Sequence, residues 1–281
     1  MGKEDGAAGR LYLCATPIGN LQDVTLRVLD VLSKADLVAA EDTRRTRKLF
    51  TRHGIHTPLM SYREENREAA ARKIVERIER GECVALVSDA GTPGISDPGE
   101  HLVRVCLERD IEIEALPGPN AALTALVLSG LPARRFAFEG FPPRKKGARR
   151  KALAELANDT RTLVFYESPA RLAETLADIE DVLGDRRVAV ARELTKRFEQ
   201  VMRGSVSDVR EQLTGEPKGE VVIVVEGSGG AAPVPMDKAL EEVMKLREEG
   251  LSLKDAVSRV AAPGSGLSRS QLYNEAVRHR G

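Results

Sequence analysis

The sequence predicts an α/β protein with two α/β domains and a small helical unit at its C-terminal end. Its 281 residues are long for one average domain and comfortable for two. Short apolar runs typical of buried strands alternate with stretches of helical periodicity along most of the chain. Hydrophobic residues make up 42% of the sequence but aromatic residues only 4%, so we expect cores built from Leu, Val, Ile and Ala.

Charge and cysteine content exclude several classes of protein. The 43 basic and 43 acidic side chains balance, which is not the composition of a bulk nucleic-acid coat protein. No apolar stretch approaches 18 residues, and the polar residues 1–10 lack the apolar segment of a signal peptide, so we expect no membrane association and a cytoplasmic location. Cys14, Cys83 and Cys106 lack metal-binding spacing and predict three reduced, buried thiols, with no metal site.

The first domain is expected to span residues 11–131, after a flexible terminus at residues 1–10. Asp42 has the short acidic side chain of an N-cap, directly before a basic helix. Strands are expected at residues 11–15, 37–40, 83–87 and 111–116. Helices are expected at residues 21–31, 43–52, 64–80, 101–109 and 121–128.

The second domain is expected to span residues 132–227. Strands are expected at residues 136–139, 162–166, 188–191 and 221–225, with a short piece at 201–202, and helices at 148–157, 169–183 and 206–213. Residues 228–235 have the Gly, Ala and Pro content of a linker. Residues 236–281 predict three helices, the second and third capped by Ser252 and Ser268. The last two resemble a helix-turn-helix, although any small helical tail would give a similar pattern.

Four loops at the ends of predicted strands are candidates for a ligand site. No familiar catalytic motif is present, but ligands in open α/β sheets bind beyond the carboxyl ends of the strands. The loops cover residues 16–20, 88–94, 117–121 and 166–169. The second is the strongest, because Asp89 follows a buried strand and precedes small residues that let a ligand approach the backbone. Taken alone, Asp89 is more typical of a turn cap, as in most isolated Asp-x-Gly sequences.

The order of these loops along the chain resembles one family of proteins. The motifs are TPIGNL at 16–21, AEDTR at 40–44, SDAGTP at 88–93, PGP at 117–119, FYESP at 165–169, RELTK at 192–196 and KGE at 218–220. Together they closely resemble the ribosomal RNA small subunit methyltransferase I family, within the tetrapyrrole-methylase-like superfamily. The resemblance runs from residue 11 to about residue 227, and the tail is similar to the short C-terminal extension of the same proteins.

This resemblance implies a fold, a cofactor and a reaction. It implies two α/β domains of the tetrapyrrole methylase type with S-adenosylmethionine in the cleft between them. It further implies 2′-O-methylation of a decoding-centre cytidine in 16S rRNA of the small ribosomal subunit, and a homodimer. The first loop, TPIGN, departs from the Gly-rich, Asp-containing loop of members that act on tetrapyrroles, which argues against a porphyrin-type substrate. The cofactor-binding residues implied are Pro17, Ser88, Asp89, Ala90, Thr92, Pro93, Asn120, Ala121, Tyr166, Leu194 and Gly219.

Methyl transfer to a ribose hydroxyl requires alignment of the reacting atoms and a group that takes the proton. Glu193 and Lys196 are the catalytic candidates, with Lys218 as a third, and an ion pair on a loop is the alternative for the first two. Two rival functions stay open. One is a methylase of a small tetrapyrrole-like substrate, and the other is a non-catalytic RNA-binding module.

Two basic runs are candidates for contact with RNA phosphates. They concentrate ten cations in a chain without net charge, and phosphate contacts supply affinity by counterion release. A solvated surface is the alternative for both runs. Phe141 is the main aromatic side chain nearby, so charge and RNA shape are expected to matter more than stacking. The residues are Arg44, Arg45, Arg47, Lys48, Arg144, Lys145, Lys146, Arg149, Arg150 and Lys151.

Overall fold

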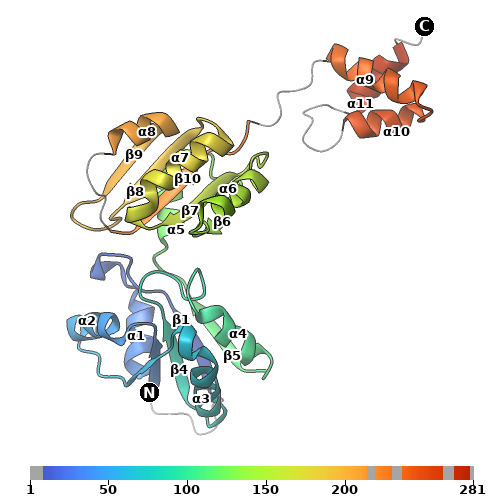
Figure 1. Ribbon diagram of the computed structural model, residues 1–281. Coiled ribbons are helices and arrows are strands. Elements are labelled where there is room, and N and C mark those ends of the chain that lie inside the picture. The colour runs from blue at the N-terminus through green and yellow to red at the C-terminus, as the bar shows by residue number, and fades with distance from the viewer. Residues whose placement is uncertain (1–8, 214–218, 230–235, 262–268, 279–281) are drawn as a thin grey trace.

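The computed structural model describes residues 9–213, 219–229, 236–261 and 269–278. Over these residues the chain forms two five-stranded sheets with flanking helices, followed by three further helices (Figure 1). This confirms the predicted fold class. Within the described ranges, every helix is too short or too polar to span a bilayer.

The first sheet has five parallel strands in the order β3-β2-β4-β1-β5. They are β1 (Arg10–Cys14), β2 (Leu37–Ala40), β3 (Leu59–Ser61), β4 (Cys83–Val87) and β5 (Glu112–Leu116). Because the strands run the same way, the loops after β1, β2, β4 and β5 emerge at one edge of the sheet. Two of these loops are tied together: Thr16 and Gly91 exchange backbone N–H to carbonyl bonds of 2.8 and 2.9 Å.

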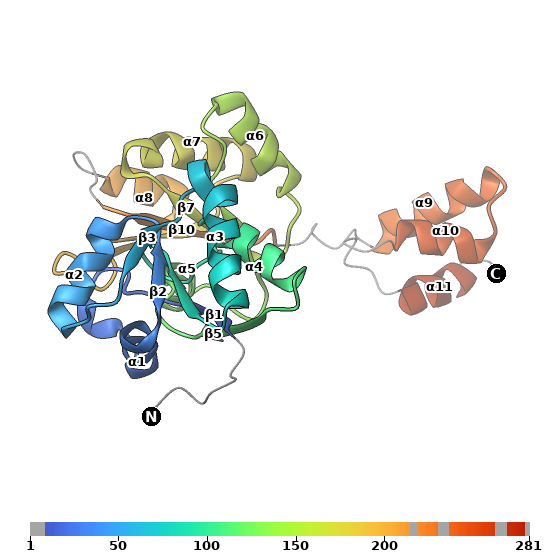
Figure 2. The ribbon, with the colours of Figure 1, turned by 90° about the horizontal axis from the view of Figure 1, so that it is seen from below.

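Four helices cover the two faces of the first sheet (Figure 2). They are α1 (Leu26–Lys34), α2 (Thr43–His53), α3 (Arg67–Glu79) and α4 (Gly99–Leu107). Residues of α1 and α2 share a buried cluster with one face of the strands, and residues of α3 and α4 share another with the alternate strand positions. Cys14 and Cys106 are buried as expected, whereas Cys83 is half-buried, so the expectation of burial is wrong for Cys83.

The helix boundaries follow from local capping. Asp42 is the N-cap of α2, as predicted, because its side chain accepts a 2.9 Å hydrogen bond from the Arg44 N–H. The helix expected at 21–31 is divided instead into a short 3₁₀ turn, Leu21–Asp23, and α1. Thr25 causes the division, since its hydroxyl accepts from the Val28 N–H and begins a new helix.

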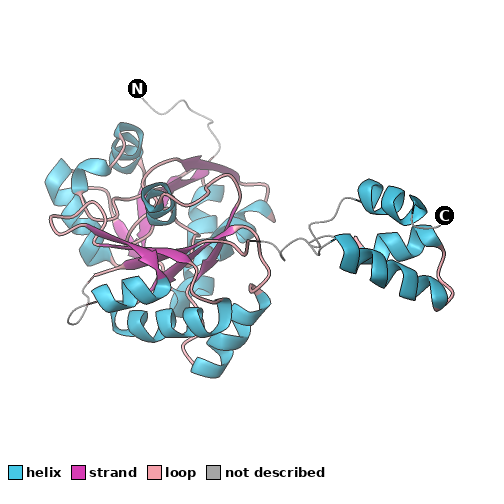
Figure 3. Ribbon diagram, turned by 90° about the horizontal axis from the view of Figure 1, so that it is seen from above, coloured by secondary structure: helices cyan, strands magenta, loops and turns pink. Residues whose placement is uncertain are grey.

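The second sheet is mixed, with the order β6-β7-β10-β8-β9. β6 and β7 are parallel, and β10 is antiparallel to both of its neighbours. Helices α6, α7 and α8 form a layer over one face (Figure 3). The strands are β6 (Phe136–Gly140), β7 (Thr162–Glu167), β8 (Arg187–Arg192), β9 (Gln200–Ser205) and β10 (Val221–Val225). The helices of the layer are α6 (Lys146–Glu155), α7 (Leu172–Leu183) and α8 (Val206–Gln212).

The other face of the second sheet is covered by α5 (Ala121–Ser129). Ala122, Ala125 and Leu126 of this helix are buried against β7, β8 and β10, and Ile18 from the loop after β1 joins the same cluster. The predicted domain boundary near residue 131 stays a prediction, but by its packing α5 belongs with the second sheet. Because Ile18 joins this cluster, the loop edge of the first sheet lies close to the second sheet.

The C-terminal unit contains α9 (Met236–Glu248), α10 (Leu253–Val260) and α11 (Arg269–Arg278). All three contribute to one buried cluster of their own. Ser252 is the N-cap of α10, as expected, since its hydroxyl accepts from the Asp255 N–H at 3.1 Å. The other expected cap, Ser268, lies outside the described residues. The resemblance to a helix-turn-helix stays a prediction.

Candidate active site

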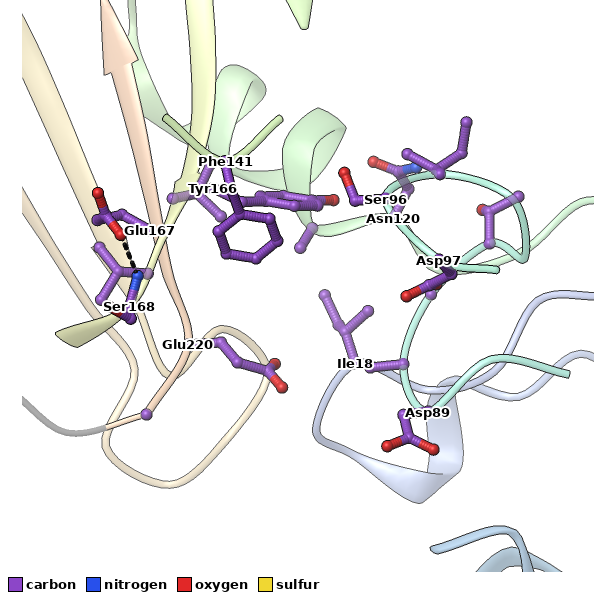
Figure 4. A pocket seen from close by; sticks show the side chains of 18 of the residues that line it. Ile18, Asp89, Ser96, Asp97, Asn120, Phe141, Tyr166, Glu167, Ser168 and Glu220 are labelled. Carbon is purple, nitrogen blue, oxygen red and sulfur yellow. Dashed lines mark hydrogen bonds between the residues drawn. The ribbon is translucent and has the colours of Figure 1, made fainter. Parts of the chain in front are cut away.

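A cavity of about 440 Å³, here called the main cavity, lies where the loop edge of the first sheet faces the second sheet (Figure 4). The loops after β1, β2, β4 and β5 form one wall, and segments next to β6, β7 and β10 form the other. Seven of the eleven residues that the resemblance assigns to the cofactor line this cavity. They are Asp89, Ala90, Thr92, Asn120, Ala121, Tyr166 and Gly219.

The other four, Pro17, Ser88, Pro93 and Leu194, are buried behind the lining. The Ser88 hydroxyl donates to the Gly91 carbonyl at 3.2 Å, and the Ser88 carbonyl accepts from the Thr16 hydroxyl at 3.0 Å. Leu194 packs in the same cluster as Ile18. These residues therefore support the loops that line the cavity.

Asp89 connects the cavity to the loop before α2. Its Oδ1 accepts a hydrogen bond from the Asp42 N–H at 2.8 Å, and its Oδ2 lies 3.4 Å from a guanidinium nitrogen of Arg45. The carboxylate thus holds two neighbouring loops in register while it also faces the cavity. Asp89 therefore both faces the cavity and caps a loop, the two roles that the sequence left as alternatives.

The lining is strongly acidic. Glu41, Asp97 and Glu220 join Asp89 there, and Arg45 is the one Lys or Arg among the described lining residues. Asp97 and Glu220 point into the cavity from opposite walls (Figure 4). Burial, reinforced by the Glu41 carboxylate, raises the pKa of Asp97 to about 7. Burial also raises the pKa of Glu41. Such a cavity favours a cationic ligand.

Backbone geometry fixes both walls. Ser96, next to Asp97, has a left-handed φ of 62°, which is strained for a residue with a side chain. Gly219 on the opposite wall has a φ of 84°, and a Cβ there would stand 1.7 Å from Glu193 Oε1. Only glycine fits at position 219 without displacing the Glu193 side chain.

The two catalytic candidates form an ion pair beside the cavity. Lys196 Nζ lies 2.8 Å from Glu193 Oε1, and neither residue belongs to the described lining. The loop packs instead against the loop after β1: the Asn20 N–H donates to the Thr195 hydroxyl at 3.0 Å. The structure therefore contains the Glu193–Lys196 ion pair that was the alternative to a catalytic role. The third candidate, Lys218, lies outside the described residues.

The basic run on α2 is partly neutralised. Arg44 pairs with Asp42 at 2.7 Å, and this contact holds the pKa of the Asp42 carboxyl well below its usual range. Arg45 faces Asp89, as described above. Arg47 and Lys48 are exposed, and no ion pair links either of them to another described residue. Contact with RNA by this run stays a prediction.

The run at residues 144–151 requires a correction. Arg149 is only 1% exposed, and its Nε donates to Asp178 Oδ2 at 2.7 Å. Arg150 bonds to Asp178 at 3.2 Å and to Asp181 at 2.7 Å. The expectation that Arg149 binds RNA is wrong. Arg149 lies on the face of α6 that packs against α7, so its side chain is buried between the two helices. The exposed side chains are Arg144, Lys145, Lys146 and Lys151.

Several lining residues were not among the predicted site residues: Ile18, Glu41, Ser96, Asp97, Phe141, Glu167 and Glu220. Three of them lie within the motifs AEDTR, FYESP and KGE, so their sequence positions could have identified them as lining residues: Glu41, Glu167 and Glu220. Asp97 follows its motif by four positions in a Pro- and Gly-rich loop, where an aspartate is more typical of a turn. Only the folded loop brings it to the cavity.

Comparison with known proteins shows which family the chain resembles over nearly its full length. The family model for tetrapyrrole (corrin/porphyrin) methylases matches residues 10–210. The chain is 44% identical to ribosomal RNA small subunit methyltransferase I of Escherichia coli O157:H7, over 99% of this chain and 98% of that protein. It is 43% identical to the protein of the same name from Bacillus subtilis, over 97% of this chain and 95% of that protein.

Solved structures with the same fold include the methyltransferase CobJ, with a TM-score of 0.60 and 20% identity over 81% of this chain and 98% of that chain. Another is uroporphyrin-III C-methyltransferase from Thermus thermophilus in complex with S-adenyl homocysteine, with a TM-score of 0.56 and 19% identity over 77% of this chain and 97% of that chain. At these identities the likeness concerns the fold. The near full-length similarity to the curated relatives is decisive for the family. The chain therefore belongs to the ribosomal RNA small subunit methyltransferase I family, whose members are methyltransferases with the tetrapyrrole methylase fold.

Proposed function

We propose that this protein transfers a methyl group from S-adenosylmethionine to the ribose 2′-oxygen of a decoding-centre cytidine in 16S rRNA. The observation that carries this proposal is the acidic main cavity, built from the motif loops of a chain that is 42–44% identical to ribosomal RNA small subunit methyltransferase I relatives. Action on ribosomal RNA would also account for the expected cytoplasmic location.

The residues of the main cavity fit the cofactor. Its volume of about 440 Å³ lies in the range of small-molecule sites. Ala90, Gly91, Ala121 and Gly219 leave backbone accessible along the walls, and the surrounding carboxylates suit a ligand with an ammonium and a sulfonium group. Asp89, Asn120 and Tyr166 are the polar side chains we expect to orient it. When bound, S-adenosylmethionine supplies a methyl group already activated by the sulfonium charge.

We assign the role of proton acceptor to Asp97. Its carboxylate faces the cavity and has no ion pair with any described residue, whereas Glu193 is neutralised by Lys196 and lies outside the lining. In the proposed reaction the 2′-oxygen gains the methyl group and its proton passes to a carboxylate oxygen of Asp97. A general base with a pKa near the working pH is the most effective kind.

The proposal is tested by methyl transfer to small ribosomal subunits that lack the modification. Labelled S-adenosylmethionine, purified protein and unmodified subunits would be incubated, and the labelled nucleotide mapped and digested to nucleosides. Label on the ribose 2′-oxygen of one cytidine is the expected result. Label on a base, or label only on a small tetrapyrrole offered in parallel, would refute the proposal. Binding of RNA without cofactor affinity would favour the non-catalytic module instead.

The homodimer implied by the resemblance stays a separate prediction. Sedimentation equilibrium of the purified protein would decide it, because a dimer of 30.6 kDa chains has twice the mass of a monomer. The experiment is independent of the methylation assay, so a monomer would leave the proposed reaction intact.

A further inference from the structure

A second pocket, here called the Phe141 pocket, adjoins the main cavity. It has a volume of about 720 Å³ and is lined by Phe141, Pro142, Pro143, Arg144, Ser168 and Arg171. Phe141 and Ser168 line both spaces, so the two meet at these residues. Its walls come from the loops after the parallel strands β6 and β7, which end at the same edge of the second sheet.

Arg171 holds the two walls of this pocket together. Its guanidinium donates to the Pro142 carbonyl at 3.2 Å and to the Ser168 hydroxyl at 3.3 Å, and it forms an ion pair with the buried carboxylate of Glu167. Thr175 donates to the other oxygen of Glu167 at 2.6 Å. Arg171 is therefore a positioning residue whose charge is already matched, and the pocket is a preformed feature.

Two other lining side chains are free to meet a ligand. The Phe141 ring is 55% exposed and lies against the Tyr166 ring, with centroids 5.6 Å apart (Figure 4). Tyr166 is in turn supported by Phe138 in an edge-to-face contact at 4.9 Å. Arg144 is exposed, and its guanidinium has no ion pair with any residue in the described ranges. The pocket thus presents a supported aromatic face and an unmatched cation.

We propose that the Phe141 pocket is a nucleotide subsite, in which Phe141 stacks on the base of the nucleotide being methylated and Arg144 binds its neighbouring phosphate. This inference rests on the proposed function. The base and the 2′-oxygen are attached to adjacent carbons of one ribose, so a ribose with its 2′-oxygen in the main cavity holds its base near the rim. Phe141 and Ser168 form the part of the rim shared by both spaces.

The chemistry of the pocket fits an unpaired nucleotide of RNA. Unstacked bases of single-stranded RNA are commonly held on aromatic rings, and guanidinium groups match phosphate oxygens. A base inside a helix cannot reach a concave pocket, so the subsite requires a nucleotide that has left its stack. Stacking on a supported ring also needs little rearrangement of the protein.

The first experiment separates stacking from simple packing at position 141. Phe141→Ala, Phe141→Leu and Phe141→Trp would be assayed for kcat/KM on unmodified small ribosomal subunits, and for S-adenosylmethionine affinity by calorimetry. We expect Ala and Leu to lower kcat/KM roughly 5- to 150-fold, the effect of losing one base–aromatic stack, and Trp to retain it. Phe198→Ala is the matched control, because Phe198 is 74% exposed and lines neither space.

The second experiment tests the cation. Arg144→Ala should reduce the slope of log affinity for subunits against log salt by about 0.7, the value for one phosphate contact to a single strand. Arg134→Ala is the control, since Arg134 is also exposed but precedes β6, whereas Arg144 follows the other end of that strand. The control should leave the slope unchanged.

Each outcome bears on the subsite. Wild-type kcat/KM in Phe141→Ala, or full activity in Phe141→Leu, overturns base stacking. A loss of S-adenosylmethionine affinity as large as the loss of kcat/KM assigns Phe141 to the cofactor and also overturns it. An unchanged salt slope in Arg144→Ala removes the phosphate contact. If the wild-type protein methylates no 16S rRNA, both the proposed function and the subsite are refuted. If the wild type and Phe141→Ala are equally active, only the subsite is refuted.

Discussion

Replacing Asp97 with Asn should produce a protein that is more stable at neutral pH but nearly inactive. Burial beside the Glu41 carboxylate raises the pKa of this carboxyl to about 7 in the folded protein, from an ordinary value of 3.8 for aspartate. One pKa unit corresponds to about 1.4 kcal/mol, so the ionised carboxylate destabilises the folded protein by at most about 4 kcal/mol. Water that enters the cavity reduces this destabilisation. Asparagine has nearly the same shape and carries no charge, so it removes this cost.

The sign of the pH dependence follows from the direction of the shift. A carboxyl whose pKa is raised by folding binds its proton more tightly in the folded state, so stability falls as pH rises from about 4 and the loss is complete above about 7. Urea unfolding should therefore give equal free energies for the wild type and Asp97→Asn below pH 4. Above pH 7 the variant should be more stable by up to about 4 kcal/mol.

Activity should change in the opposite direction. Loss of a general base lowers kcat by about 10²- to 10⁴-fold, and the rise of kcat/KM with pH near 7 should disappear in Asp97→Asn. Glu220→Gln is a suitable comparison, because Glu220 faces Asp97 across the cavity and is not assigned the proton. It should weaken cofactor binding and keep the pH dependence. An Asp97→Asn variant with wild-type kcat would refute the reasoning, and so would a stability difference that does not vary with pH.

Three further predictions follow from the same contacts. Asp89→Asn should keep the bond from the Asp42 N–H and the fold, but bind S-adenosylmethionine more weakly in calorimetry; equal affinity would remove Asp89 from the cofactor site. Arg149→Ala should lower the free energy of unfolding in urea by about 3–5 kcal/mol, because Asp178 is 2% exposed and loses its main partner; a loss below 1 kcal/mol would contradict the buried pair. Removal of residues 230–281 should leave cofactor affinity unchanged, since α9–α11 form a separate core, and lower subunit methylation; full activity at limiting substrate would show that the tail is dispensable.

Buried strands were the most predictable elements of the fold. The strand expected at residues 83–87 and the one at 221–225 have the predicted bounds, because a short continuous apolar run leaves few alternatives. β3 was missed since its three half-buried residues, Leu59–Ser61, show neither alternation nor an apolar run. The antiparallel insertion of β10 between β7 and β8 also has no local signal, as strand order depends on long-range pairing.

The site was predictable where a motif follows a strand and unpredictable where tertiary contacts decide. The loop at 88–94 was identified because small residues after a buried strand allow a ligand to approach. Arg149 and Arg144 look alike in the sequence, yet one is buried against Asp178 and the other is exposed. Arg149 lies on α6 and faces Asp178 of α7, whereas Arg144 precedes the first residue of α6. The number of basic residues in a run of sequence therefore overestimates how many of them are exposed to RNA.

The RELTK motif at 192–196 combines an ion pair with a strained backbone, and its role in catalysis stays a prediction. Glu193 and Thr195 both have left-handed φ angles, of 51° and 66°, which cost about 1–2 kcal/mol each for residues with side chains. A glycine lies against this strained loop on each side, where a larger residue would collide with it. A Cβ on Gly19 would stand 2.6 Å from Lys196 Cγ, and a Cβ on Gly219 would overlap the Glu193 side chain. Gly19 belongs to the loop after β1 and Gly219 to the second wall of the cavity, so the loop at 193–196 contacts both walls. In the proposed reaction the proton passes to a carboxylate inside the cavity, and the Glu193–Lys196 ion pair would act on the position of the two walls instead.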